Sequence, residues 1–408
     1  MVPSTSGVDD EGFRAALVGA AWEMFARRSP SSVSVRVLAE MAGCSHGTIT
    51  STFGSRSGLE RAVADQVAVT VEEAVVDVLA QPGWPFGAML RMRHEHPRVT
   101  RLFVRLGLGD LPIDDFLSRS TIGDRLVGRI EGFRGGSPRR PTQRSRLAAH
   151  GVLCTVLGAC TFDIFNIRSV RSAGIDGSVR DAALTNALTL IAELPADDAV
   201  ELRTVHRRSE TALPSPPRPP DLGRSDVSDA LITSVIELFA VRGPSAISIR
   251  DIAANAGLQH GLIHRHFGTK EALLNAAIDR LAQVTITGMS RPAGVDVGAL
   301  VRMQRRSLNP WIIARLMADG VDVTESRRSY PLVDAVLDTF PDVPDGDGPG
   351  DLTDPRLAVY AVSSLISGYA LWDVPVRRLV GLPTGADVDL DPAVTLMVER
   401  LLAVPRRR

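Results

Sequence analysis

The sequence has few of the residues that usually announce a function. Its three cysteines, Cys44, Cys154 and Cys160, form an odd set without paired metal spacing, which argues against a disulfide scaffold and against zinc. Aromatic residues make up only 5% of the chain, and the formal net charge is −1. Because no global basic excess points to nucleic acid, any DNA-binding surface has to be a local patch.

Signals for export or membrane insertion are also lacking. The first residues, MVPSTSGVDDEGF, have no basic stretch followed by an apolar run, so they do not resemble a signal peptide. The longest apolar stretch, from Gly151 to Phe162, is too short to span a bilayer. We therefore expect a soluble cytoplasmic protein without a membrane partner.

The chain does contain an internal duplication. Residues 16–59 align with residues 230–273 at a constant offset of 214, without a gap and with 19 identities in 44 positions. A weaker repeat continues at offsets of 211 and 210, where residues 87–92 match 298–303 and Gly158, Phe162-Asp163 and Asp181 fall on Gly368, Trp372-Asp373 and Asp391. A whole unit of roughly 200 residues has therefore been duplicated.

The second copy carries the clearer local pattern. Apolar residues at helical spacing from Leu231 to Phe239 predict a first helix, and Ser248-Ile-Arg-Asp251 predicts a capping box at the start of a second. Gly257 fits the left-handed position of a tight corner between two helices. A third helix, at about residues 259–267, is then free to enter a major groove, which makes the segment a helix-turn-helix.

Both segments resemble the N-terminal DNA-binding domain of the TetR family of bacterial repressors. In the second copy the resemblance rests on ELF (237–239), SIRDIA (248–253), AG (256–257), GLIHRHF (261–267) and TKEAL (269–273). It covers some 50 residues of each copy. It implies an all-α fold with helix-turn-helix domains at residues 10–72 and 226–288. Helical ligand-binding and dimerisation domains would follow at 73–202 and 289–408, with a proline-rich linker at 203–225.

Carried over by position, the resemblance assigns DNA contacts to both copies. In the second copy, Ser248, Arg250 and Lys270, the chain's only lysine, would meet backbone phosphates. The remaining residues of this set would line the recognition helix, where Gln and Arg side chains can contact base edges: Gln259, His260, Leu262, His264 and Arg265.

The first copy is more degenerate. Val37 stands where the capping acid would be, so this helix start loses one reciprocal hydrogen bond. Its helix-turn-helix either still binds DNA with an altered sequence preference or serves only as a scaffold. The equivalent DNA-binding residues are Ser34, Arg36, Ser45, His46, Thr48, Thr50, Ser51 and Arg56.

The remainder of each half offers candidates for a small-molecule site, although plain core packing explains any one of them better than ligand contact does. His94 and His96 are two residues apart, do not face the same side of a helix, and do not form a metal site; no cofactor is indicated. The candidate ligand contacts are Trp84, Met92, Phe103, Phe165, Met303, Trp311, Tyr360 and Tyr369.

The last two predicted helices of each half concern how the two halves of the chain pack on each other. Residues 146–166 and 356–374 match as long helices, each followed by a shorter one at 181–194 and 391–404. In the resembled family the equivalent pair forms a four-helix bundle with a second subunit. The resemblance therefore implies an intramolecular pseudo-dimer, with the recognition helices roughly 34–36 Å apart on double-stranded DNA. Further homodimerisation of whole chains is left open.

These features predict a sequence-specific transcriptional regulator, a repressor modulated by a small, apolar effector. The alternative is a ligand-binding or protein-interaction module whose DNA-binding heads have degenerated. An enzyme has little support, because the sequence shows no Ser/His/Asp constellation, glycine-rich phosphate loop or metal-ligand spacing.

Overall fold

The computed structural model describes residues 6–193, 203–204, 226–242, 247–291, 294–321, 330–344, 348–385 and 388–407, and they are mostly helical, as predicted. The first half contains α1 (Ser6–Phe25), η1 (Pro30–Ser32), α2 (Val35–Met41), α3 (His46–Phe53), α4 (Arg56–Ala80), α5 (Phe86–Glu95), α6 (Pro97–Gly107), α7 (Asp114–Arg119), α8 (Ile122–Phe133), α9 (Gln143–Ser169) and α10 (Gly177–Ala192). The second contains α11 (Val227–Arg242), α12 (Ile249–Ala256), α13 (Gly261–Phe267), α14 (Lys270–Met289), α15 (Val297–Arg306), α16 (Asn309–Ala318), α17 (Pro331–Leu337), α18 (Pro355–Val380), α19 (Asp391–Ala403) and η4 (Pro405–Arg407).

Four two-residue strands accompany the helices in the part of the chain that the structure describes. The strand β1 (Arg203–Thr204) pairs antiparallel with β4 (Val388–Asp389), and β2 (Ser290–Arg291) pairs with β3 (Gly294–Val295). The start of the predicted linker is therefore attached to the second half, while residues 205–225, predicted as an extended tether, lie outside the described residues.

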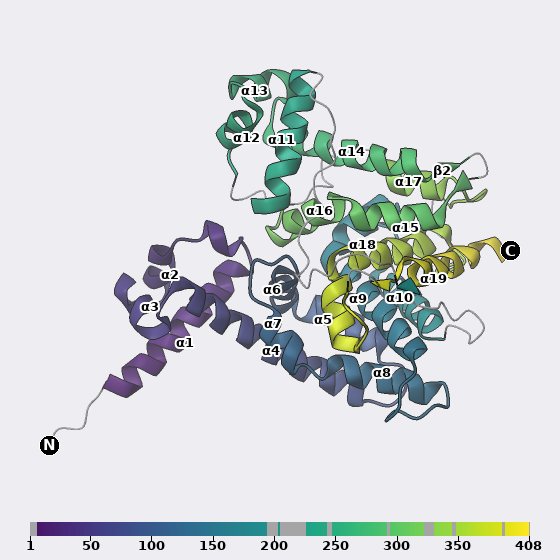
Figure 1. Ribbon diagram of the computed structural model, residues 1–408, viewed down its shortest axis with the longest axis horizontal. Helices are drawn as coiled ribbons and strands as arrows, with labels where there is room; N and C mark the ends of the chain where they lie inside the picture. Colours follow the sequence, from purple (N-terminus) through teal and green to yellow (C-terminus); the bar gives the residue numbers. More distant parts are fainter. Residues whose placement is uncertain are drawn as a thin grey trace.

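The chain folds into two small heads and one helical body. Figure 1 shows the heads as separate lobes, with α1–α3 on the left and α11–α13 at the top. A single helix joins each head to the body, α4 for the first and α14 for the second, so the domain boundary expected at residue 72 falls inside α4. The same positions form both head cores at the offset of 214, namely Leu17, Phe25, Leu38, Ile49 and Leu59 with Leu231, Phe239, Ile252, Ile263 and Leu273.

The body is centred on α9 and α18, which pack on each other more extensively than any other two helices of the described chain. They cross at Gly158 and Gly368, two positions related by the offset of 210. A Cβ atom on Gly158 would lie 1.8 Å from the carbonyl oxygen of Ser364, and one on Gly368 would lie 1.8 Å from that of Cys154. Since both obstacles are backbone atoms, only glycine allows this close approach of the two helices.

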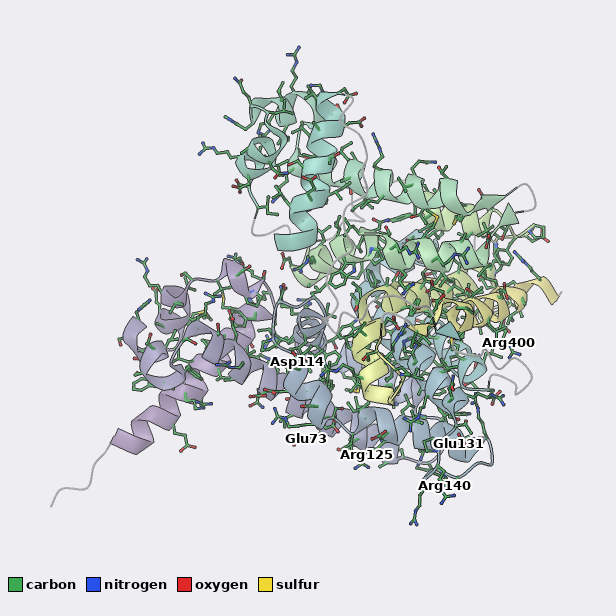
Figure 2. The ribbon with its side chains drawn as sticks, viewed as in Figure 1. Glu73, Asp114, Arg125, Glu131, Arg140 and Arg400 are labelled. Carbon is green, nitrogen blue, oxygen red and sulfur yellow. The ribbon has the colours of Figure 1, made fainter. Side chains whose placement is uncertain are left out.

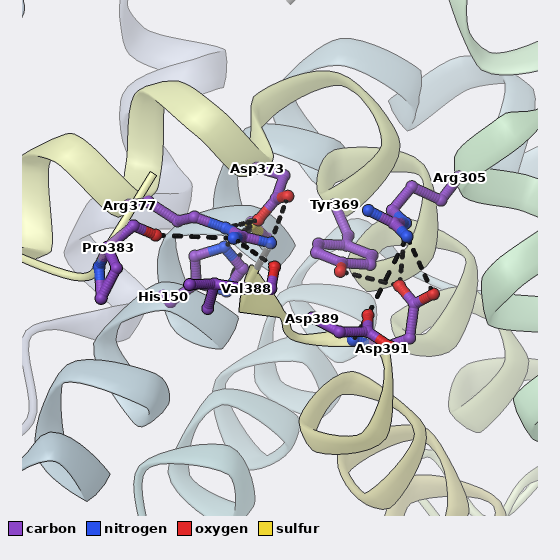
Figure 3. Close-up of polar contacts among 10 residues, drawn as sticks. His150, Arg305, Tyr369, Asp373, Arg377, Pro383, Val388, Asp389 and Asp391 are labelled. Atoms are coloured by element: carbon purple, nitrogen blue, oxygen red, sulfur yellow. Dashed lines mark hydrogen bonds and ion pairs between the residues drawn. The ribbon is translucent and has the colours of Figure 1, made fainter. Parts of the chain in front are cut away.

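Polar contacts on either side of this crossing are reciprocal. His150 of α9 contacts Asp373 of α18 (Nε2–Oδ1 2.9 Å), and Tyr360 of α18 donates to Asp163 of α9. The offset of 210 relates His150 to Tyr360 and Asp163 to Asp373. Burial alone would raise the pKa of Asp373, but its contacts with His150 and with Arg377 outweigh this effect and lower that pKa (Figure 3).

A second buried carboxylate lies beside this pair and behaves in the opposite way. Asp391, at the start of α19, accepts a hydrogen bond from Tyr369 at 2.8 Å and pairs with Arg305 of α15 at 2.9 Å (Figure 3). Burial raises the pKa of Asp391 in spite of both partners. Burial also raises the pKa of Tyr369, so this hydroxyl remains a hydrogen-bond donor.

The apolar stretch from Gly151 to Phe162, which by itself is too short to span a membrane, lies within the longer helix α9. By length and composition, both α9 and α18 could cross a bilayer, but 78% of the most apolar window of each is buried inside the protein. Their apolar character is therefore explained by packing in the body.

Candidate DNA-binding interface

The second head begins its helix-turn-helix with the predicted capping box. The Ser248 hydroxyl accepts a hydrogen bond from the Asp251 backbone N–H at 3.2 Å, and the Asp251 carboxylate accepts one from the Ser248 N–H at 2.7 Å. Gly257 ends α12 in the left-handed conformation, with φ +70°, as predicted. These two features fix the direction in which α12 leads into α13.

The second head presents polar groups on its outer face, at the start of α12, in the turn before α13 and in the recognition helix α13 itself. Arg250, Gln259, His260 and Arg265 are exposed, and none of their side chains has a partner among the described residues. His264 is also exposed, but its Nδ1 lies 3.0 Å from the carbonyl oxygen of Gly268, which holds the ring at the end of the helix. Four polar groups, two of them guanidinium groups, are thus free to meet DNA.

Of the three other residues of the predicted set, two have partners within the head. The Ser248 hydroxyl belongs to the capping box, and Leu262 of α13 is half-buried. Lys270 is half-buried, donates to the carbonyl oxygen of Ile247, and lies 5.5 Å from the centre of the Phe239 ring. Burial lowers the pKa of Lys270. Its ammonium group therefore ties α14 to Ile247, two residues before α12.

The first head repeats this tie with an arginine. Arg56 at the start of α4 donates from Nη1 to the carbonyl oxygen of Val33 at 2.6 Å and pairs with Glu60 at 2.8 Å. Val33 and Ile247 are equivalent at the offset of 214, so a cation fastens the same loop in both copies.

The outer face of the first head is less basic. Ser34 caps α2 through the Val37 N–H at 3.3 Å without a reciprocal bond, as predicted. Ser45 and Thr48 share a hydrogen bond of 2.9 Å, and the Ser51 hydroxyl donates to the Thr48 carbonyl oxygen at 3.0 Å. These hydroxyl groups therefore already have partners. The exposed residues of the predicted set that remain are Arg36, His46 and Thr50.

A buried arginine connects the first head to the second half of the chain. Arg105, on α6, is 1% exposed and donates from Nε to the carbonyl oxygen of Phe25 at the end of α1. Its Nη2 donates to the carbonyl oxygen of Ala318 and to the carboxylate of Asp319, both at 2.9 Å. One guanidinium group thus joins a head, the α6 helix and the end of α16.

Arg315 of α16 makes the reverse contact at the offset of 210. It donates to the carbonyl oxygen of Leu108 at 3.0 Å and to Asp110 at 2.8 Å. We call the two arginines with Leu108, Asp110, Ala318 and Asp319 the arginine clamp. The carbonyl contacts at Leu108 and Ala318 are equivalent at the offset of 210, but the two arginines differ at Nε: the buried Nε of Arg315 has no partner among the described residues, whereas that of Arg105 holds the first head.

Each half also contains a cavity. The first, of about 310 Å³, lies between α4, α5, α6 and α9 and includes Met92 and Phe103 in its wall. The second, of about 70 Å³, lies between α14–α18 and includes Phe165, which reaches it from α9 of the other half.

The other candidate ligand contacts lie outside both cavity walls. Trp84 stacks between Phe86 and Phe133. Tyr360 and Tyr369 are fully buried and donate to carboxylates. Met303 packs beneath Gly288, and Trp311 is 1% exposed in the core.

Sequence reasoning missed the arginine clamp and gave no role to Gly158 and Gly368. A signal existed for both, because Arg105 and Arg315, like the two glycines, are identical residues at the offset of 210. Identical residues in a weakly similar region mark positions where both halves need the same contact.

Taken together, two exposed recognition helices on small three-helix heads define a helix-turn-helix DNA-binding regulator. Comparison with known proteins gives its family. The sequence pattern of bacterial regulatory proteins of the tetR family matches twice, at residues 17–63 and 231–277. The HTH-type transcriptional repressor Rv3405c of Mycobacterium tuberculosis is 34% identical over 182 residues, which cover 44% of this chain and 91% of that protein. The HTH-type transcriptional regulator Mb3439c of Mycobacterium bovis matches to the same extent. The chain belongs to the TetR family of bacterial regulatory proteins.

Proposed function

We propose that the chain is a cytoplasmic, ligand-responsive repressor in which one polypeptide supplies both DNA-binding heads of an operator complex. We keep the boundaries predicted from the sequence as part of the proposal, with residues 10–72 and 226–288 for the heads and 73–202 and 289–408 for the ligand-binding and dimerisation domains. The observation that carries the proposal is the reciprocal contact between the halves. The crossing at Gly158 and Gly368 and the arginine clamp relate the halves as two subunits of a symmetric dimer would be related.

The two heads contribute unequally to DNA binding in this proposal. Arg250, Gln259, His260 and Arg265 of the second head are exposed and free to contact phosphates and base edges, and His264 lies beside them. The first head offers Arg36, His46 and Thr50, with serine and threonine hydroxyls that can accept or donate once their present partners move. The operator should therefore consist of two different half-sites.

Two helices that connect the first cavity with the first head support the proposal that a ligand regulates DNA binding. The helix α6 lines the first cavity with Phe103, and two residues further Arg105 holds Phe25 of the first head. The helix α4 lines the same cavity with Val71 and Val75 and continues into that head. A ligand that prefers one position of these helices would shift the spacing of the heads and lower the affinity for DNA.

The test is a mobility-shift and footprinting experiment on the DNA upstream of the gene, over a salt series, with the mass of the complex measured by light scattering. We expect one chain per footprint and a steep fall in affinity with salt, because phosphate contacts release counterions. Arg265→Ala should cost about 1–3 kcal/mol on the specific site. Ser51→Ala, at the equivalent position of the first head, is the matched control and should cost far less.

Other outcomes would count against parts of the proposal. Two chains on a single footprint would contradict the intramolecular arrangement, and a palindromic operator bound equally at both halves would contradict unequal heads. The absence of any shift at low salt would favour a ligand-binding or protein-interaction module with degenerate heads.

A further inference from the structure

The two cavities occupy equivalent places in the two halves, which allows their walls to be compared position by position. At the offset of 210, Leu153, Val156 and Leu157 of α9 correspond to Ser363, Ile366 and Ser367 of α18, and each set lines its own cavity. Val99 and Phe103 of α6 correspond in the same way to Asn309 and Ile313 of α16.

The first cavity is apolar in its depth. Its buried wall consists of valine, leucine, isoleucine, methionine and phenylalanine side chains from α4 to α9, together with Leu379 of α18. Charged or ionisable side chains that face it are Glu73 and His96, both exposed, together with the half-buried thiol of Cys160. Glu73 lies on the outer surface of α4 in Figure 2, so this charge belongs to the mouth of the cavity.

The second cavity has acquired polar groups at the same places. Ser363, Ser367 and Asn309 stand where the first cavity has Leu153, Leu157 and Val99. No acidic or basic side chain is among the described residues that line it.

Two of its amide oxygens lack partners. Gln304 is 8% exposed and Asn309 is 4% exposed, and the buried oxygens Oε1 of Gln304 and Oδ1 of Asn309 have no hydrogen-bond partner among the described residues. Buried amide oxygens are almost always satisfied in proteins, by other groups, water or a ligand. Both residues line the cavity, so a bound molecule that donates hydrogen bonds would supply the missing partners.

We propose that the two cavities bind ligands of different chemistry. The first takes an apolar molecule without polar groups in its buried part. The second takes a neutral molecule that carries a hydrogen-bond donor, such as an amide, beside an apolar body. This inference rests on the proposed function, since it assigns to the regulator two separate inputs. The second cavity, at about 70 Å³, has to widen around anything larger than a few water molecules.

The test uses two fragments with the same ring, toluene and benzamide, and the full-length protein without DNA. Binding is measured by saturation-transfer NMR titration of each fragment. Leu157 and Ser367 are half-buried at equivalent positions, so Leu157→Phe and Ser367→Phe fill one cavity each and serve as controls for one another. We expect Leu157→Phe to abolish toluene binding alone and Ser367→Phe to abolish benzamide binding alone.

A second pair of variants covers the case in which a phenylalanine prevents folding. Asn309→Val removes the polar group and should weaken benzamide about tenfold while leaving toluene unchanged. Val99→Asn introduces it in the first cavity and should weaken toluene instead. Circular dichroism and thermal unfolding show whether each variant is folded.

Three results would overturn the inference: both fragments lost with the same variant, benzamide unaffected by Asn309→Val in the folded protein, or no binding of benzamide to the wild type. Because fragment binding is measured without DNA, a protein that binds both fragments as expected but does not bind its upstream DNA would refute only the proposed function.

Discussion

The close crossing of α9 and α18 leads to a strong prediction at Gly158. An alanine there places its Cβ 1.8 Å from the carbonyl oxygen and 2.7 Å from the carbonyl carbon of Ser364, and 3.0 Å from the backbone nitrogen of Gly368. All three atoms belong to the backbone of α18, which cannot move aside as a flexible side chain would, so the two helices have to separate. Overpacking of this kind costs about 1–3 kcal/mol, and the contact of backbone with backbone places Gly158→Ala at the upper end.

The assay is thermal unfolding followed by circular dichroism. For a cooperative unit of about 150–250 residues, each 1 kcal/mol shifts Tm by about 2–4 °C, so Gly158→Ala should lower Tm by several degrees. The matched control is Gly19→Ala in α1, where nothing lies within 4 Å of the added Cβ. That change should stabilise the first head by about 0.5–1 kcal/mol, since alanine is the better helix former. A Tm for Gly158→Ala equal to or above that of the wild type would refute the close crossing.

Other predictions concern the clamp and pH. Arg105→Ala should increase hydrogen exchange at the end of α1, because the carbonyl oxygen of Phe25 loses its donor, whereas Arg315→Ala should leave the second head unchanged; equal effects on both heads would contradict the asymmetry. Each change removes one partner of a buried ion pair and should cost about 3–5 kcal/mol. The pKa of Asp373 is lowered in the folded protein, so its contribution to stability is present above the ordinary carboxyl pKa near 4 and is lost as pH falls through its folded pKa. The difference in Tm between the wild type and Asp373→Asn should therefore shrink as pH falls below 4, and a difference that grows in acid would contradict this sign.

The heads could be predicted from the sequence in some detail because their determinants are local. The capping box at Ser248, the left-handed Gly257 and the apolar spacing from Leu231 to Phe239 each act over a few residues, and each lies where it was expected. The role of Lys270 was harder to predict, because its position at the start of α14 indicates a phosphate contact, while its partner Ile247 lies 23 residues away in the sequence.

The contacts between the two halves in the body could not be predicted from the sequence, because they join residues more than 190 positions apart. Arg105 and Arg315 are equivalent at the offset of 210, but their carboxylate partners in the opposite half, Asp319 and Asp110, are not equivalent to each other. Asp110 is the third residue after the end of α6, whereas Asp319 is the first residue after the end of α16. Ligand candidates chosen as large apolar residues were divided by geometry alone: Phe103 lines a cavity, while Trp311 fills the core. Residue type does not distinguish these two outcomes, because both side chains are large and apolar.

Arg105 holds the first head through Phe25, and Arg315 makes no equivalent contact with the second head. This difference explains how the first head can contribute to DNA binding although it has few basic side chains. The first head has mainly hydroxyl groups at its recognition helix, but Arg105 fastens it to the body through Phe25. Two linked sites bind DNA together with an effective concentration that depends on how well their spacing is held. A head that is already positioned loses little entropy on binding, so even weak contacts from Thr50 and Arg36 add to the affinity. We therefore expect Arg105→Ala to reduce affinity for the full operator more than for an isolated half-site of the second head, in mobility-shift titrations at one salt concentration. Equal losses on both DNAs would mean that the fastening of the first head has no part in operator binding.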